Sequence, residues 1–371
     1  MQVPSDHIVE MAFDLYENID YRDPKIFFPY VKGKLKDEGM HYVLLDEVQL
    51  LGDFEAVLNS LSRLPNVDLY VTGSNAKFLS KDVITEFRGR GDEIRLYPLT
   101  FGEFMSVYEG TVEQAWKEYL LYGGLPLVLE LGSEQQKTQF LKTLLTETYL
   151  KDIAGRNQVR HQNELTELLN ILASAIGSLT NPSKLSATFK SVKQQAISQS
   201  TIKKYIEYFE DSFLIDSALR YDVKGKRYIN TPLKYYFSDL GLRNAQLNFR
   251  QVEETHALEN IIFNELKVRG FNVDVGVVIT NEVNKQGTKT RRQREIDFVC
   301  NQGSKRYYIQ SALSLTDEDK KMQEQRSLLL TQDGFKKIII TKDAPAPLYN
   351  ESGVLIMGVY DFLLDEHSLE I

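Results

Sequence analysis

Two short apolar runs joined by a helical pattern constrain the fold of this chain more than any other feature. Residues 42–45 are continuously apolar, which is typical of a strand buried on both faces of a sheet. Apolar side chains then recur at helical spacing between residues 54 and 61, and residues 69–71 form a second apolar run. A strand, a helix and a second strand predict a right-handed βαβ unit in a parallel sheet.

Polar residues follow both predicted strands. Asp46 and Glu47 end the first strand, and the second runs into Thr72-Gly73-Ser74-Asn75. In P-loop ATPases, a first carboxylate at such a strand end orients Mg²⁺ through its waters, and a second polarises the attacking water. Strands also often end in acids because carboxylates are well hydrated there. Taken alone, the pair therefore leaves both interpretations open.

Two arginines follow in a glycine-containing segment, residues 87–91. The guanidinium groups of Arg88 and Arg90 suit contact with an anion. The same segment is compatible with a solvated loop whose glycines are flexible. The residues alone leave these two interpretations open as well.

The rest of the chain predicts several domains, since 371 residues are too many for one ordinary core. Helical periodicity runs from residue 98 to about residue 179. The next segment predicts two helices and a hairpin, which is the order of a winged helix. The last third begins with a helix near residues 255–268 and continues with short strands, as in a mixed α/β module. We therefore expect domains at residues 1–110, 111–180, 181–250 and 251–371.

Six motifs taken together resemble one family. They are Leu44-Leu45-Asp46-Glu47-Val48-Gln49, Thr72-Gly73-Ser74-Asn75, Arg88-Gly89-Arg90, Pro98-Leu99-Thr100-Phe101-Gly102-Glu103-Phe104, Tyr122-Gly123-Gly124-Leu125-Pro126 and Lys234-Tyr235-Tyr236-Phe237-Ser238-Asp239-Leu240-Gly241-Leu242-Arg243. In this order they are similar to prokaryotic AAA-type ATPases that carry a C-terminal domain of uncharacterised function. The resemblance implies an α/β fold with a parallel-sheet AAA-type core and a helical lid. It also implies ATP and Mg²⁺ as cofactors.

The resemblance further implies roles for particular residues at the nucleotide site. The candidates are Asp46 and Glu47 for the Walker B pair, Asn75 or Ser74 for the sensor position, and Arg88 or Arg90 for the arginine finger or a neighbouring phosphate contact. Asp46 would also hold the metal, and Ser74 would contact the nucleotide. An arginine finger normally reaches the site of an adjacent subunit, so the resemblance implies a homo-oligomer.

The phosphate-binding loop of that family is missing from the printed sequence. Such a loop needs G-x-x-x-x-G-K-[ST], so that backbone N–H groups surround the phosphates and the Lys neutralises their charge. Gly-Lys occurs only at residues 33–34 and 225–226, without the earlier Gly and without a following Ser or Thr. We expect an N-terminally truncated family member that hydrolyses no measurable ATP alone and whose residues before Met40 are poorly packed. Loss of the loop's hydrogen bonds should cost at least about 3 kcal/mol, a factor above about 100 in affinity.

Two sets of basic residues point to nucleic acid. The first belongs to the second helix and the hairpin turn of the predicted winged helix, and the second lies between residues 285 and 294, with no acid among them. The candidates are Lys203, Lys204, Lys224, Lys226 and Arg227 in the first set, and Arg291 and Arg292 in the second. A winged helix used only for packing or protein contact is the alternative for the first set. A mobile hairpin loop that its charge keeps in solvent is the alternative for the second.

Residues 255–312 also resemble the restriction-endonuclease-like fold. An active site of that type needs an acid on a helix, an Asp at a strand start and Glu-x-Lys on the next strand, where the acids hold Mg²⁺ and the Lys assists the attacking water. Glu259 and Asp297 occupy the first two places, but the third reads Gln310-Ser311-Ala312. Gln binds Mg²⁺ poorly and Ala has no amine, so we expect a retained fold without nuclease activity. Asp297 is then a structural carboxylate paired with Arg294 or another basic residue.

Composition narrows the function classes. The 44 basic and 52 acidic side chains give a net charge of −8, so contact with nucleic acid would need a local basic patch. The single Cys excludes a disulfide framework, and the spacing of the five His predicts no zinc site. The N-terminus is acidic, and the longest nearly apolar stretch is about half a membrane span. We expect a cytoplasmic protein without a membrane partner: an AAA-type ATP-binding protein or, alternatively, a non-enzymatic nucleic-acid- or protein-binding module built on the C-terminal half.

Overall fold

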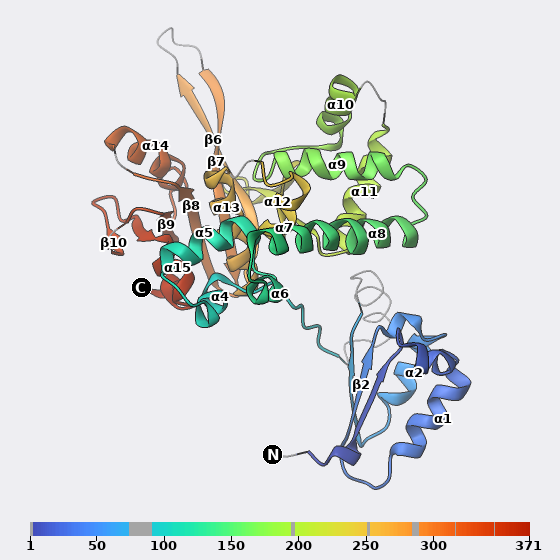
Figure 1. Cartoon of the computed structure of the whole chain (residues 1–371). Helices are drawn as coiled ribbons and strands as arrows, with labels where there is room; N and C mark the ends of the chain where they lie inside the picture. The colour runs from blue at the N-terminus through green and yellow to red at the C-terminus, as the bar shows by residue number, and fades with distance from the viewer. Residues whose placement is uncertain are drawn as a thin grey trace. The chain divides into compact units, whose positions relative to one another are not determined.

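The computed structural model describes residues 3–73, 91–193, 197–250, 253–283, 289–315, 317–344 and 346–371. The chain forms two compact units (Figure 1). Unit 1 comprises Met1–Arg95 with Asp211–Phe213, and unit 2 comprises Leu96–Glu210 with Leu214–Ile371. The elements of unit 1 are η1 (Ser5–His7), β1 (Ile8–Ala12), η2 (Tyr16–Arg22), α1 (Pro24–Lys34), β2 (His41–Asp46), η3 (Val48–Leu50), α2 (Phe54–Leu61) and β3 (Val67–Val71).

Unit 1 is built on a three-stranded parallel sheet in the order β1-β2-β3. The predicted βαβ unit is present as β2, α2 and β3. In the central strand β2, the side chains of Val43 and Leu45 are buried. They form one core with the buried face of α2, which includes Val57 and Leu61. The apolar runs of the sequence therefore predicted the two strands and the helix between them correctly.

The prediction that residues before Met40 are poorly packed is wrong. Strand β1 pairs in parallel with β2, and its Val9 and Met11 are buried. Phe13 and Phe27 are fully buried, with ring centroids 5.2 Å apart. The physical reason is that the first 31 residues carry apolar side chains at strand and then helix spacing, so β1 and α1 complete the core of the sheet.

The open side of the sheet lies instead at β3. Among the described residues this strand pairs with β2 alone, so one row of its backbone N–H and C=O groups has no neighbouring strand. None of its five residues is buried, and Tyr70 is 48% exposed. Parallel strands are normally covered on both sides. Strand β1 is the other edge of the sheet, but its Val9 and Met11 are buried, so in the described part of the chain β3 is the less covered edge.

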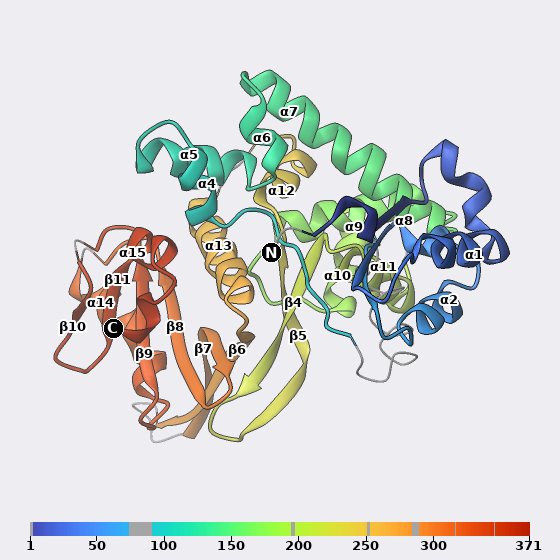
Figure 2. The same ribbon diagram turned by 90° about the horizontal axis from the view of Figure 1, so that it is seen from below.

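Unit 2 combines a helical region with a large mixed sheet (Figures 1 and 2). Its helices are α4 (Phe101–Val107), α5 (Val112–Tyr122), α6 (Pro126–Glu130), α7 (Glu134–Thr143), the π-helical η5 (Leu144–Leu150), α8 (Lys151–Arg156), α9 (Gln162–Ser174), α10 (Pro182–Lys193), α11 (Gln199–Asp211), α12 (Leu240–Gln246), α13 (Glu254–Val268), α14 (Glu318–Leu329), α15 (Val359–Leu364) and η6 (Ser368–Glu370). Its strands are β4 (Ile215–Asp222), β5 (Arg227–Phe237), β6 (Asn272–Val283), β7 (Lys289–Gln302), β8 (Lys305–Ala312), β9 (Lys336–Thr341), β10 (Leu348–Tyr349) and β11 (Leu355–Gly358).

The sheet has eight strands in the order β10-β11-β9-β8-β7-β6-β4-β5. Helix α13 packs on one face, against β5 to β8, and α14 packs against β7, β8 and β9. The two cores follow the two-residue period of a strand. Ile338 and Ile340 of β9 join the core with α13, whereas Ile339 between them packs with Leu328 of α14. The sheet is therefore covered on both faces.

The hairpin of the predicted winged helix exists as β4 and β5, but it belongs to the large sheet. Strand β4 pairs antiparallel with β5 and parallel with β6, where Arg220 lies opposite Val275. The segments predicted as lid, winged helix and nuclease-like domain accordingly lie in one compact unit. The boundaries between them stay predictions. None of the described helices is both long and apolar enough to span a bilayer.

Candidate functional site

The acid pair of unit 1 lies at the carboxyl end of the central strand. Asp46 is the last residue of β2, and Thr72 directly follows β3. The two strand ends are held together because Thr72 N–H donates to Leu45 O at 2.8 Å and Val48 N–H donates to Thr72 O at 3.1 Å. The Thr72 hydroxyl donates to the Asp46 carboxylate, and Glu47 N–H donates to that hydroxyl at 3.4 Å. The acid pair therefore lies at the carboxyl edge of a parallel sheet, beside the polar residue that follows the neighbouring strand.

The conformation of Glu47 sets the direction of its side chain. Its backbone is left-handed, with φ 52° and ψ 46°, which is uncommon for a residue with a Cβ and costs about 1 kcal/mol. The Gln49 amide donates to the Glu47 carboxylate. Asp46 is exposed and, in the described part of the chain, forms no ion pair. An exposed carboxylate held by a neutral hydroxyl keeps lone pairs available for a hydrated Mg²⁺.

Four predicted residues of this site cannot be placed in the same way. Ser74, Asn75, Arg88 and Arg90 lie outside the described residues. Their sensor, nucleotide-contact and arginine-finger roles stay predictions.

A second acid cluster lies inside unit 2, around Lys234 of β5. Its ammonium Nζ is 2.8 Å from Glu259 Oε1, 2.7 Å from Glu295 Oε1 and 3.7 Å from Asp297 Oδ1. Lys234 is 3% exposed, and Glu259 and Asp297 are 7% exposed each. The Tyr236 hydroxyl donates to Glu259 Oε1 at 2.7 Å. Glu259 and Asp297, which the sequence predicted to lie together, are thus joined by a lysine.

On both Glu259 and Lys234, burial and the neighbouring opposite charge shift the pKa in opposite directions. Burial raises the pKa of Glu259 to about 7, although the Lys234 ammonium opposes the shift. Burial also disfavours the Lys234 ammonium, but the carboxylates of Glu259, Asp297 and Glu295 outweigh it and raise the pKa of Lys234. Lys234 therefore stays charged at every physiological pH, and Glu259 exchanges a proton near neutrality.

Asp297 is held from two sides. Ser311 donates to Asp297 Oδ2 through its backbone N–H at 2.8 Å and through its hydroxyl at 3.1 Å. The other oxygen faces Lys234. The basic partner of Asp297 is therefore Lys234. The Gln310 side chain lies beside it, because the Asp297 N–H donates to Gln310 Oε1 at 3.4 Å.

Sequence reasoning missed Lys234, although one signal was available. The residue opens the run Lys234-Tyr235-Tyr236-Phe237, which is otherwise aromatic. A lysine in a strand that is buried on both faces has to be paired with an acid. Its partners, however, come from α13 and β7, which the sequence alone did not place against β5.

The basic candidates for nucleic acid are exposed but separated. Lys203 and Lys204 lie on α11, and Lys224, Lys226 and Arg227 lie in and beside the β4–β5 turn. Strand β4, of eight residues, spans about 25 Å between the end of α11 and that turn. The structure thus presents these residues at two places.

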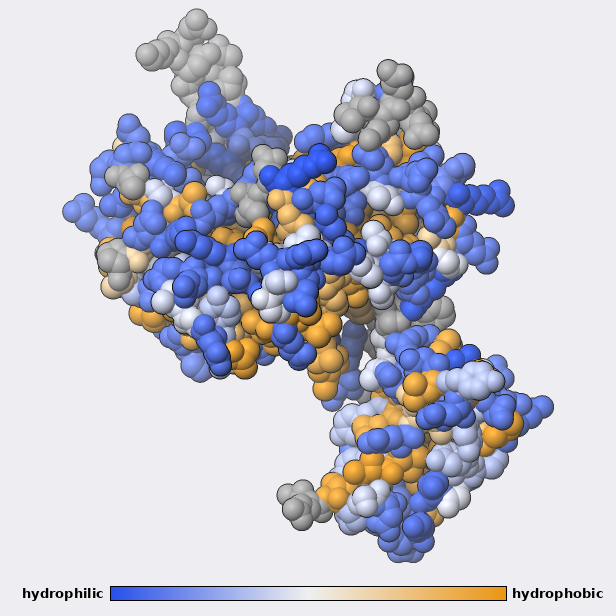
Figure 3. All heavy atoms as spheres, in the orientation of Figure 1, coloured by the Kyte–Doolittle hydropathy of each residue, from blue (hydrophilic) through white to orange (hydrophobic). Residues whose placement is uncertain are grey.

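One interpretation of the second basic patch is a mobile loop over residues 285–294. Residues 289–294 belong to strand β7, which contradicts that part of the interpretation, and residues 285–288 lie outside the described residues. Arg291 and Arg292 are exposed on β7, where they lie opposite Asn281 and Thr280 of β6. The two strands form an arm that extends out of unit 2 (Figure 1), with a hydrophilic surface (Figure 3). The polar sequence of the arm hid its strand character, because neither face alternates with apolar residues.

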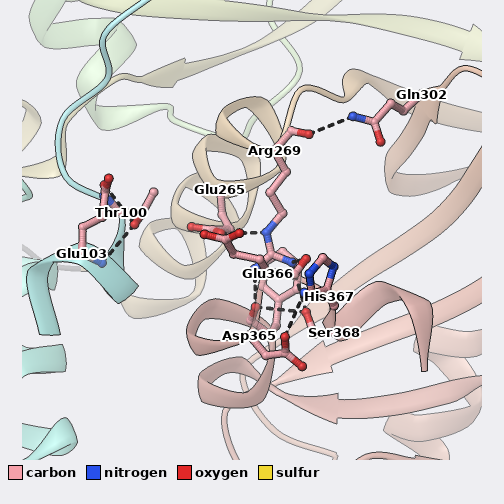
Figure 4. A network of polar contacts seen from close by, with 10 residues as sticks. Thr100, Glu103, Glu265, Arg269, Gln302, Asp365, Glu366, His367 and Ser368 are labelled. Atoms are coloured by element: carbon pink, nitrogen blue, oxygen red, sulfur yellow. Dashed lines mark hydrogen bonds and ion pairs between the residues drawn. The ribbon is translucent and has the colours of Figure 1, made fainter. Parts of the chain in front are cut away.

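Unit 2 also contains a cavity of about 630 Å³ between α4, α13 and the C-terminal segment. Arg269 lines this cavity, and Figure 4 shows its polar contacts, in which Nε donates to Glu265 Oε1 at 2.7 Å. The same guanidinium donates to Ser368 Oγ at 3.0 Å, to Glu366 O at 3.2 Å and to Phe362 O. These bonds use four of its five N–H groups. Arg269 is therefore neutralised and oriented by the cavity's own wall, and Lys305, which also lines the cavity, is paired with Glu370 at 2.5 Å.

Comparisons with known protein families match two separate segments of the chain. Residues 2–105 match the family model "AAA domain", and residues 113–253 match a "Domain of unknown function (DUF8612)". Two solved structures are also similar to this chain. The Aeropyrum pernix ORC1 protein in complex with DNA has 12% sequence identity and a TM-score of 0.23, and the match covers 64% of this chain and 77% of that chain. Protein VC1899 from Vibrio cholerae has 12% sequence identity and a TM-score of 0.24, and the match covers 94% of this chain and 79% of that chain. TM-scores this low carry no argument about fold or function.

Two relatives match along nearly the whole length. MJ1544 of Methanocaldococcus jannaschii, an uncharacterized protein, is 29% identical over 357 residues, covering 92% of this chain and 75% of its own. An uncharacterized protein of Haemophilus influenzae is 32% identical over 371 residues, covering 98% of this chain and 87% of its own. The chain therefore belongs to the family of the Haemophilus influenzae protein, and its N-terminal part is related to AAA-type ATPases.

Proposed function

We propose that this protein is an AAA-type ATP-binding protein whose nucleotide-bound Mg²⁺ is managed by Asp46 and Glu47. The observation that supports it is the junction of Asp46 with Thr72 at the carboxyl edge of β2 and β3, inside the segment that matches an AAA domain. Asp46, exposed and held by a hydroxyl, orients the metal through its waters. Glu47 follows it in a fixed left-handed conformation and polarises the attacking water.

The proposal includes the residues that the structure does not describe. Asn75 or Ser74, a few residues beyond Thr72, senses the terminal phosphate. Arg88 or Arg90 is offered to the site of an adjacent subunit, so the working form is a homo-oligomer. ATP and Mg²⁺ are the cofactors.

Hydrolysis needs a phosphate cradle that the printed residues do not contain. In the described part of the chain β3 has no second neighbouring strand, and a further strand there would bring such a loop beside Asp46. Without the cradle, ATP binding should be weaker by a factor above about 100. We therefore expect the chain alone to bind Mg²⁺·ATP weakly and not to turn it over.

The experiment is a phosphate-release assay with Mg²⁺·ATP on the wild type, Glu47→Gln and the control Glu38→Gln. Glu38 is exposed and lies just before the amino end of β2. The proposal expects no release above buffer from any of the three. Turnover that Glu47→Gln abolishes and Glu38→Gln leaves intact would confirm the role of Glu47 but contradict the missing cradle. Turnover that neither variant changes would contradict the site itself.

A second candidate function is nucleic-acid binding by unit 2, favoured by the exposed Arg291 and Arg292 on the β6–β7 arm. Phosphate contacts release counterions, so the logarithm of the affinity should fall linearly with the logarithm of the salt concentration. A gel-shift series across salt tests this with Arg291→Gln/Arg292→Gln, which should lower the slope by about two contacts. If the affinity of the wild type does not change with salt concentration, the basic residues do not contact nucleic acid. The arm would then be a protein-binding surface.

A further inference from the structure

Three metal-ligating side chains meet at the amino end of β2, away from the acid pair at its carboxyl end. They are His7 at the end of η1, Asp37 in the loop after α1, and His41, the first residue of β2. His7 Nε2 lies 3.2 Å from Asp37 Oδ2, and the two imidazole rings stack with centroids 4.4 Å apart. Among the described residues this is the one such group in which three ligand atoms all lie within 4.8 Å of one another.

The pairing of β1 with β2 creates this arrangement. Ile8 lies opposite Tyr42, so His7 and His41, which precede them, are brought side by side. The spacing of the histidines along the sequence predicted no zinc site, because that argument considers only ligands on one helix. A site assembled from three elements gives no such spacing.

Backbone carbonyl groups orient both imidazole rings. His7 Nδ1 is 3.0 Å from Met40 O, and His41 Nδ1 is 2.8 Å from Gly39 O. A carbonyl oxygen can only accept, so both Nδ1 atoms carry the hydrogen and, in the neutral rings, both Nε2 atoms carry the lone pair. Metal-binding histidines are held in this way, with the other ring N–H donating to a carbonyl or carboxylate.

The third ligand is fixed as well. Gly39 N–H donates to Asp37 Oδ1 at 2.8 Å, which leaves Oδ2 directed at His7. This hydrogen bond orients the Asp37 carboxylate and lowers its pKa. A Cβ at residue 39 would come within 2.8 Å of the His7 ring and 2.9 Å of the Asp37 carboxylate, so a larger residue there would displace these side chains.

With the hydrogen on His7 Nδ1, the Nε2 lone pair and Asp37 Oδ2 are two acceptors that face each other. His7 Nε2 and an oxygen of the Asp37 carboxylate lie 3.2 Å apart, so either a proton on the imidazole or a metal ion bridges them. Two ligands at about 2.1 Å from one ion are about 3.4 Å apart in tetrahedral geometry, close to the observed 3.2 Å. His41 Nε2 now accepts a long hydrogen bond of 3.3 Å from Lys36 N–H, which coordination would replace.

We propose that His7, Asp37 and His41 bind one divalent transition-metal ion of the zinc class. Two imidazoles and one carboxylate suit Zn²⁺ better than Mg²⁺ or Ca²⁺, which prefer all-oxygen sites. The ion joins η1, the α1–β2 loop and β2, so it stabilises the N-terminal segment of unit 1. Strand β2 places it about 17 Å from Asp46, which separates this site from the nucleotide metal.

The experiment uses the full chain without an affinity tag, stripped with a chelator and then titrated with Co²⁺ and Zn²⁺. We expect one equivalent of Co²⁺ with visible ligand-field absorption, which Zn²⁺ displaces, and a rise in Tm on adding Zn²⁺. His7→Ala and Asp37→Asn should each weaken binding more than about 100-fold, the upper cost of losing an outer-shell partner. His41 is fully buried and is left unchanged, because its replacement endangers folding.

His367→Ala is the matched control, since the side chain of His367 is 82% exposed. It should keep full binding. Circular dichroism of each variant shows whether it is folded. A folded wild type without stoichiometric binding, or equal binding by folded His7→Ala, would overturn the proposal and make the three residues a proton-bridged ion pair only.

Discussion

The two acid clusters of this protein are made of the same side chains but lie in opposite surroundings. Asp46 at the end of β2 is exposed, and the Thr72 hydroxyl donates to it. Glu259 and Asp297 are buried, and the ammonium of Lys234 lies between them. A hydrated carboxylate stays available to an outside cation, whereas buried carboxylates need a counterion from the chain, because an unpaired buried charge costs several kcal/mol.

The difference bears on the nuclease-like site in particular. The Lys234 ammonium contacts both acids that the sequence assigned to that site, Glu259 at 2.8 Å and Asp297 at 3.7 Å. Among the described residues, Glu259, Glu295 and Asp297 do not converge to the spacing of metal ligands. An internal lysine therefore takes the place of the cation. The nuclease-like fold and its lack of activity stay predictions.

The largest expected effect comes from removing that lysine. Lys234→Met leaves buried carboxylates without their counterion and should lower the free energy of unfolding of unit 2 by about 3–5 kcal/mol. Chemical denaturation measures it, with Lys203→Met on the exposed face of α11 as the control, expected within about 0.5 kcal/mol. Adding Glu259→Gln to Lys234→Met should recover part of the loss. A loss no larger than the control's would mean that the buried cluster is as well hydrated as Asp46.

An effect of intermediate size is expected in the pH dependence of the free energy of unfolding. Since burial raises the pKa of Glu259 to about 7 from its ordinary 4.5, the folded protein binds more protons than the unfolded chain between these values. Its free energy of unfolding should therefore fall as pH rises through this window, by roughly 1–3 kcal/mol between pH 5 and pH 8. Burial raises the pKa of Asp239 to about 6, which acts in the same direction.

The pH dependence of Glu259→Gln isolates the contribution of Glu259, because Asp239 is unchanged in that variant. The wild type should lose more stability than the variant between pH 5 and pH 8. If the wild type and Glu259→Gln lose the same stability between pH 5 and pH 8, Glu259 is ionised over that whole range. The two clusters would then differ in exposure alone.

The smallest effect on stability is expected at the exposed cluster. Asp46→Asn should change the free energy of unfolding by no more than about 0.5 kcal/mol, because the Asn side chain can still accept from Thr72 and no buried charge is left unpaired. Denaturation of Asp46→Asn beside Asp297→Asn compares the two clusters directly. A cost for Asp46→Asn as large as that for Asp297→Asn would make Asp46 a structural carboxylate.

The sequence predicted the parts of the fold that show a clear period. Strands β2 and β3, helix α2 between them and the β4–β5 hairpin follow from apolar runs and turn residues. Strand β1 was missed because Glu10 interrupts its short apolar pattern. The outer half of β7 was missed because it is polar on both faces. Both strands are specified by pairing with a neighbour, which a local pattern does not contain.

The candidate sites, too, were predictable only where their residues lie at the ends of predicted strands. Asp46, Glu47 and Thr72 lie close to predicted strand ends, so their meeting followed from the topology of a parallel sheet. Lys234 and the group of His7, Asp37 and His41 depend on contacts between elements far apart in the chain. Sequence spacing carries no information about such contacts until the sheet order is known.

The most direct test of the account is equilibrium binding of Mg²⁺·ATP to the full chain, compared with ATP in chelator. The account predicts weak binding that needs Mg²⁺, that Asp46→Asn abolishes, and that Glu295→Gln in the lysine-filled cluster leaves unchanged. Binding that ignores Asp46→Asn, or that Glu295→Gln abolishes instead, would contradict the assignment of the metal-bound nucleotide to the exposed acid pair.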